Sequence, residues 1–153
     1  MIQAINTQTV TAALVQLIGN DQTILDIGNV RVESNEPINK DPAKTPWVGI
    51  YQVAHRFNPR ALGFGTGFRM QQLELAIILS ESSMKSGADC EARMEKLISS
   101  VVGAILSDPS IGGTMTMTAD QFQITYSDYR NEGGAFFKEA VIQFTVESPV
   151  TVT

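Results

Sequence analysis

The stretch from Phe68 to Ser80 constrains the fold of this chain more than any other part of the sequence. Large aliphatic side chains recur there at every second position, and Gln72 and Glu74 are expected on the other face. The aliphatic positions are Leu73, Leu75, Ile77 and Leu79. A period of two is the repeat of a β-strand, whose successive side chains point to opposite sides of the sheet. The stretch therefore predicts a sheet with at least one face covered by other elements.

Further stretches favour β-structure because they are rich in branched and aromatic residues or alternate with polar ones. The second of them, WVGIYQVAHRF, follows Pro46, and a polar connection with two prolines, residues 34–45, precedes it. Gly133 and Gly134 predict a turn before the last strand. The expected strands are residues 30–33, 47–57, 114–118, 122–126 and 136–146.

Two stretches carry apolar residues at helical spacing. The first is expected to begin at a Thr7 cap and to end at Gly19-Asn20, where a residue tolerant of positive φ fits. Its apolar positions are Val10, Ala13, Leu14, Leu17 and Ile18. The second runs from about Ala88 to Leu106 and stops before Asp108-Pro109. Its stripe consists of Met94, Leu97, Ile98, Val101 and Ile105.

The order helix, strands, helix, strands predicts an α+β fold. We expect residues 1–153 to form a single domain with a mostly antiparallel mixed sheet, two helices packed on one face, and a long β-hairpin loop. A chain of 153 residues can bury roughly two-thirds of its unfolded surface. The last residues, Pro149 to Thr153, are expected to fray or to dock on a neighbouring molecule.

The overall composition excludes several classes of protein. The net charge is −5, and no window concentrates Lys and Arg into the basic stripe that a nucleic-acid binder needs. Cys90 is the only cysteine, so no internal disulfide can form, and its helical context predicts a buried structural thiol. The N-terminus lacks a signal peptide pattern, and Leu75 to Leu79 is far shorter than the roughly 20 residues that span a bilayer. We therefore expect a soluble protein made in a reducing cytoplasm, with no membrane partner.

No catalytic, cofactor-binding or metal-binding set is visible in the sequence. His55 is the only histidine, which excludes a metal site built from several histidines. Asp21 and Asp26 flank two apolar residues, and paired-carboxylate catalysis would need a cleft that the sequence does not indicate. The glycines of residues 63–67 precede a strand rather than a helix and lack the spacing of a phosphate-binding loop.

The segment FNPRALGFGTG, Phe57 to Gly67, is the strongest functional signal. It joins two expected strands, yet it carries aromatic, aliphatic and basic residues together. Such a mixture also occurs where proteins stack single-stranded nucleic acid. Because the chain is acidic, we favour a protein interface, where arginine and aromatic residues are also enriched. The candidate residues for a subunit or tube interface are Phe57, Pro59, Arg60, Leu62, Phe64, Phe68 and Arg69.

The order of elements over nearly the whole chain resembles the tail terminator (tail completion) proteins of long-tailed bacteriophages. The resemblance is carried by five stretches of the sequence. They are the N-terminal helix with Val10, Leu14 and Leu17, PWVGIY at Pro46 to Tyr51, LELAIIL at Leu73 to Leu79, the helix end at Ala104 to Pro109, and FFKEAVIQFTV at Phe136 to Val146.

The resemblance implies a non-enzymatic virion subunit that is made in the host cytoplasm. In that family the subunits form a hexameric ring that caps the tail tube, stops its polymerisation and offers a neck surface to the head. The implied partners are further copies of this chain, the tail tube protein and a head-completion or connector protein, with DNA only passing through the lumen. Two alternatives stay open: another neck or tail subunit, such as a head–tail joining or tube protein, and a small cytoplasmic enzyme using Asp21, Asp26 or His55.

Overall fold

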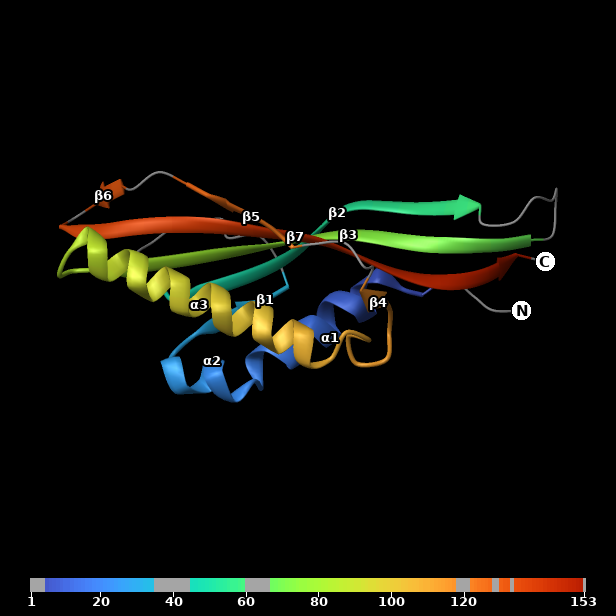
Figure 1. Cartoon of the computed structure of the whole chain (residues 1–153), viewed down its shortest axis with the longest axis horizontal. Helices are drawn as coiled ribbons and strands as arrows, with labels where there is room; N and C mark the ends of the chain where they lie inside the picture. The colour runs from blue at the N-terminus through green and yellow to red at the C-terminus, as the bar shows by residue number, and fades with distance from the viewer. Residues whose placement is uncertain are drawn as a thin grey trace.

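The computed structural model describes residues 5–34, 45–59, 67–117, 122–127, 130–132 and 134–152. It has an α+β fold in which the helices lie together on one side of a long, twisted sheet (Figure 1). The helices are α1 (Thr7–Gly19), α2 (Gln22–Ile27) and α3 (Gly87–Ser107). The strands are β1 (Arg31–Glu33), β2 (Trp47–Pro59), β3 (Gly67–Ser83), β4 (Thr116–Met117), β5 (Gln123–Tyr126), β6 (Arg130–Glu132) and β7 (Ala135–Val152).

The sheet is mostly antiparallel, as the sequence predicts, and only β1 and β2 pair in parallel. Its order is β1-β2-β3-β7-β4, and β5 and β6 also pair with β7. One edge of β7 pairs with β3 along its whole length, from Gly67 opposite Val152 to Ser83 opposite Phe136. The other edge meets β6, β5 and β4 in turn, so β7 connects most of the sheet.

The predicted hairpin is present, and it is longer than the helical layer beneath it. β2 and β3 pair from Trp47 opposite Ser80 to Pro59 opposite Arg69, with an irregularity in register between Gln52 and Ala54. The ends of β2, β3 and β7 extend together beyond the helices (Figure 1). We call this extension the arm: residues 53–59 of β2, 67–72 of β3 and 147–152 of β7.

The hydrophobic core lies between the sheet and the helices. The four aliphatic residues that alternate along β3 are completely buried, as are Val10, Leu14 and Ile18 of α1, whereas Ala13 and Leu17 are only partly buried. The whole apolar stripe of α3 is buried. The helix–sheet contact therefore follows the two periodicities in the sequence. The core residues that carry it include Val10, Leu14, Ile18, Leu73, Leu75, Ile77, Leu79, Leu97, Val101 and Ile105.

The helix boundaries correct three expectations. Asn6, not Thr7, caps α1, because its side-chain oxygen accepts a hydrogen bond from the Gln8 N–H at 2.9 Å and Thr7 is already helical. The residue after the helix, Asn20, has a φ of −97°, so no left-handed residue ends it. The sequence reading also missed α2, which is too short to show a helical period. Asp21 begins this helix by accepting from the Thr23 N–H at 2.9 Å.

The C-terminal part of the chain corrects two further expectations from the sequence. The prediction that the chain frays from Pro149 onward is wrong for the described residues, because β7 continues to Val152 as the ladder partner of β3. Pro149 is tolerated because that stretch lies at an edge of the sheet, where a missing N–H costs no ladder bond. The expected strand at residues 114–118 is reduced to Thr116–Met117, with Thr118 outside the described residues.

Candidate assembly surface

The arm exposes two large apolar side chains on β2. Phe57 is 47% exposed and Val53 is 46% exposed. The Phe57 ring packs against the His55 ring, with centroids 4.9 Å apart and planes inclined by 47°. Val53 lies at the register irregularity, which places it outside the regular pairing with β3. Single exposed apolar side chains are common on protein surfaces, and what distinguishes these two is that both lie on the strand that forms an outer edge of the arm.

The opposite face of the arm is polar. The Arg56 guanidinium forms an ion pair with the Glu74 carboxylate at 3.0 Å, and the Gln72 amide donates to Glu147 at 3.3 Å. These side chains surround a small hollow of about 150 Å³, lined by Ala54, Arg56, Gln72, Glu74 and Thr145. The arm therefore carries its ion pair on the face opposite Phe57 and His55.

Both outer edges of the arm present backbone without a strand partner in the part of the chain that the structure describes. β1 pairs with β2 only at Trp47 to Gly49, which leaves the β2 edge from residue 50 to 59. β4 meets β7 at Val146 and Glu147, which leaves residues 148–152 on the other side. An unpaired strand edge is a template for pairing with another chain, and native proteins usually shorten or block it.

The structure places four of the seven predicted interface residues on the arm. Phe57 is exposed there, Pro59 lies opposite Arg69 in the ladder, and Phe68 is part of β3. Arg60, Leu62 and Phe64 lie outside the described residues. Sequence reasoning missed Val53, although one signal was available: the apolar positions of β2 are even at Val48 and Ile50 but odd at Phe57.

The residues of the enzyme alternative have structural partners, Asp21 and Asp26 at α2 and His55 on the arm. Asp21 caps α2, and Asp26 accepts from the Gln22 amide at 2.7 Å within the same helix. His55 belongs to the arm, where it contacts Phe57 and Gln71. Within the described ranges, no group of three His, Cys, Asp or Glu side chains is placed to hold a metal ion. None of the described helices has the length and apolar character that crossing a bilayer requires.

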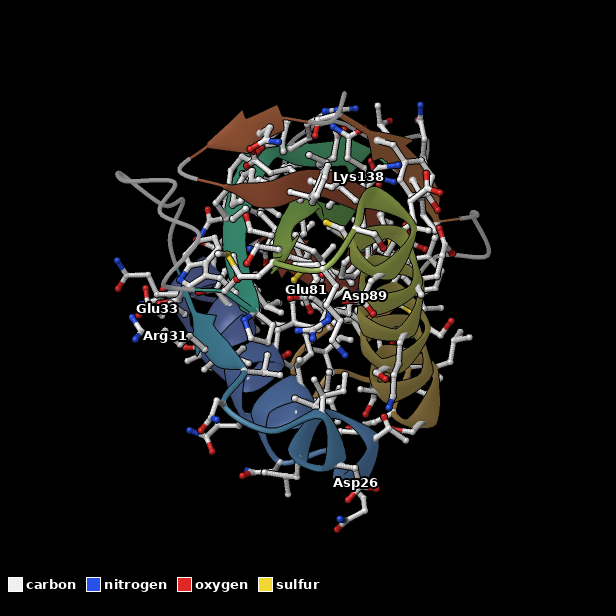
Figure 2. All side chains as sticks on the ribbon, turned by 90° about the vertical axis from the view of Figure 1, so that its left-hand side faces the viewer. Asp26, Arg31, Glu33, Glu81, Asp89 and Lys138 are labelled. Atoms are coloured by element: carbon white, nitrogen blue, oxygen red, sulfur yellow. The ribbon has the colours of Figure 1, made fainter. Side chains whose placement is uncertain are left out.

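Polar residues surround the start of α3, where Glu81 and Asp89 lie near each other and Lys138 lies apart from them in the view of Figure 2. Ser83 donates to the Asp89 carboxylate, which also accepts from Arg93 at 3.0 Å. The hydrogen bond from Ser83 is the main cause that lowers the pKa of Asp89. Lys138 forms an ion pair with Glu91 of α3 at 3.0 Å. These contacts hold the first turns of α3 against β3 and β7, which is a structural role.

An open groove of about 650 Å³ lies where α1 and α2 meet the turn after α3. Both carboxylates of the groove accept hydrogen bonds from nearby backbone. Asp21 caps α2, and Asp108 accepts from the Gly112 N–H at 2.9 Å. Hydrogen bonds from Ser110 and Gly112 lower the pKa of Asp108. The lining residues are Ala13, Gln16, Leu17, Asn20, Asp21, Gln22, Ser107, Asp108 and Gly112.

Comparison with known proteins gives no family. No protein-family model matches the sequence, and no curated protein matches it. A chain in the structure of the virion of a native gene transfer agent particle is similar, with a TM-score of 0.42 and 12% identity. The alignment covers 90% of this chain and 94% of that chain. A likeness at this level assigns neither a family nor a function.

Proposed function

We propose that this chain is a non-enzymatic structural subunit of a phage particle. In this proposal, copies of it form a closed ring, a hexamer by the resemblance stated above, that caps the tail tube, ends its polymerisation and offers the neck surface to the head. The observation that carries the proposal is the arm, a projecting three-stranded sheet whose two outer edges have no strand partner among the described residues. A small monomeric protein gains nothing from two such edges, whereas a ring pairs or covers both.

The two edges differ, and this difference favours a ring over a symmetric dimer. β2 and β7 both pair antiparallel to β3, so they run in the same direction on opposite sides of it. A copy rotated about an axis near the strand direction therefore brings its β7 beside the β2 of its neighbour in parallel orientation. Such a contact joins two different surfaces and closes into a ring when the rotation closes.

The two ends of the subunit are also chemically different, which suits a cap. The arm is a bare extension of strands that ends in the exposed Phe57, whereas the opposite end of the sheet is covered by the start of α3, which contacts of Asp89 and Lys138 hold in place (Figures 1 and 2). A ring with unlike ends can match a tube on one side without repeating that site on the other. Polymerisation then stops by occupancy of the tube end. The net charge of −5 disfavours binding to DNA that passes through the ring.

Two measurements test the proposal. The molecular mass of the purified protein in solution gives its oligomeric state, and electron microscopy shows whether it forms rings of tail-tube diameter. Val53→Lys places a charge at the β2 edge and Phe57→Asp places one on the face that carries His55, and each should weaken self-association by roughly tenfold or more. Met84→Asp is the matched control, since Met84 is 74% exposed at the other end of the sheet. The control should assemble like wild type, and all three variants should unfold at nearly the wild-type temperature.

A wild-type protein that stays monomeric at high concentration and does not bind tail-tube ends would refute the proposal. The exact place in the particle is a separate question, because the same edges suit another ring-forming neck or tail subunit. Particles made without this protein separate the two. Loss of a terminator gives overlong or headless tails, whereas loss of a joining protein gives unattached tails of normal length.

A further inference from the structure

Gln71 is a fully buried polar residue on the arm, and its partner is a backbone segment far away in the sequence. Its side-chain oxygen accepts from the Ile5 N–H at 2.8 Å, and its side-chain nitrogen donates to the Ile5 carbonyl at 2.7 Å. The side-chain amide thus pairs with one peptide group as a neighbouring strand would. The same nitrogen lies 2.9 Å from His55 Nε2.

These contacts determine which groups donate and accept. An amide side chain has two N–H donors on nitrogen and only acceptor sites on oxygen. Turning the Gln71 amide around would set oxygen against the Ile5 carbonyl and nitrogen against its N–H, so the observed orientation is fixed. One N–H of Gln71 serves Ile5, and the other points to His55. His55 Nε2 must therefore be the acceptor, which places the imidazole proton on Nδ1.

We propose that Ile5, Gln71 and His55 form a proton-sensitive latch that holds the N-terminal segment on the arm. When the imidazole gains a proton, both of its nitrogens become donors. Nε2–H then faces the Gln71 N–H, and the amide cannot turn to accept it without breaking both bonds to Ile5. Protonation therefore replaces the hydrogen bond between Gln71 and the exposed His55 by two facing donors, which removes one of the three contacts of the latch and weakens it. An unperturbed histidine side chain changes its charge between about pH 5 and 8, so the latch is tested across that range.

Charged groups near His55 would also affect how the latch depends on pH, so the residues around it matter. The ladder neighbours of His55 are apolar, Leu73 on β3 and Val146 beyond it on β7. α1, which packs against β2, has no charged residue in its sequence. The Arg56–Glu74 ion pair belongs to adjacent ladder positions and so to the opposite face of the sheet. Arg69 is two residues from Gln71 along β3.

The test is amide hydrogen exchange at Ile5, measured residue by residue on the full-length protein from pH 8 to pH 5. The His55 imidazole signal, which is unique in this chain, gives the protonation midpoint in the same samples. His55→Phe keeps an aromatic contact with Phe57 but cannot be protonated. Comparison with this variant at each pH also removes the intrinsic pH dependence of exchange. We expect wild-type Ile5 to exchange roughly tenfold faster than in H55F at pH 5, and equally at pH 8.

Gln71→Met tests the amide itself. It should remove Ile5 protection at both pH values while protection of the Ile77 amide in the centre of β3 is kept. Exchange at Ile5 that follows the His55 midpoint in wild type and not in H55F supports the latch. The proposal is overturned if Ile5 shows the same pH response in wild type and H55F, or if it stays protected in Q71M. None of these measurements depends on whether the protein forms rings.

Discussion

The thiol of Cys90 on α3 donates a hydrogen bond to the backbone carbonyl of Glu81 on β3, with sulfur and oxygen 3.6 Å apart. Both side chains are withdrawn from water, Cys90 completely and Glu81 to 3% exposure. Burial raises the pKa of the Cys90 thiol and, separately, the pKa of the Glu81 carboxyl. The predicted buried structural cysteine is thus confirmed, and the contact joins the first turn of α3 to the sheet.

Cys90 is expected to be unreactive in the folded protein, because only the thiolate attacks alkylating reagents and the fold disfavours it. Iodoacetamide should modify the native thiol at least roughly tenfold more slowly than the denatured one, since access requires local opening. Met84→Cys in a Cys90→Ala background places a thiol at a 74% exposed position and should react rapidly without denaturant. Equal rates for the two native thiols would show that Cys90 is accessible.

Glu81→Gln should stabilise the protein at neutral pH. The pKa of Glu81 is raised from 4.5 by burial, so the folded state holds its proton more tightly than the unfolded chain does. Ionisation therefore favours unfolding, and stability falls as the pH rises from about 4.5 through the folded pKa. Urea unfolding should show E81Q as the more stable protein at pH 7, with the difference vanishing below about pH 4. If E81Q gained more stability over wild type in acid than at pH 7, this prediction would be wrong.

Asp89→Asn should have the opposite pH dependence. The pKa of Asp89 is lowered from 3.8, first by the Ser83 hydrogen bond, so its charged form stabilises the fold. That contribution is present above pH 3.8 and is lost as the pH falls through the lower folded pKa. D89N should be less stable than wild type at pH 7, and the two should converge below pH 3.8. Ser83→Ala, which removes the donor but keeps the carboxylate, should show a smaller loss with the same pH dependence.

Leu75→Ala should destabilise the protein by about 2–5 kcal/mol, because Leu75 is completely buried in the central strand and truncation leaves a cavity. Leu106→Ala is the matched control at the end of α3, where the side chain is 55% exposed. Its effect should stay within about 0.5 kcal/mol. Thermal or urea unfolding measures both variants. Similar losses for the two leucines would mean that Leu106 is covered by another molecule.

Asp21→Ala tests the enzyme alternative. It should cost about 1 kcal/mol of stability through loss of the α2 cap, while ring formation stays intact. Asp26→Ala, on the exposed side of the same helix, should cost less. Loss of a catalytic activity with unchanged assembly in either variant would instead favour an enzyme.

The regular parts of the fold could be predicted from the sequence because their periodicity and their burial agree. The alternation in β3 and the stripe of α3 each face the core, and Asp108 ends α3 as expected. The shorter features of the fold could not be predicted from the sequence. α2 has too few residues to show a period, and the long extent of β7 depends on β3 being present as its partner.

The candidate site could be predicted only in part. The apolar segment between two expected strands identified Phe57 as a candidate interface residue, because an aromatic side chain in a connecting segment has no evident role in the core. The contact between Gln71 and Ile5 has no sequence signature, since it joins residues 66 positions apart through one side-chain amide. The change from even to odd apolar positions along β2 indicates an irregularity, but only the register of β2 against β3 locates it at Val53.

The length of β7 has a consequence for biogenesis. β3, β4, β5 and β6 all precede it, and each of them pairs with it. Until residues 135–152 have left the ribosome, β4, β5 and β6 lack their ladder partner and β3 is paired only with β2. Contacts so distant along the chain close slowly. A nascent chain of this kind is therefore most vulnerable to aggregation just before its final strand is made, which is when a chaperone would matter most.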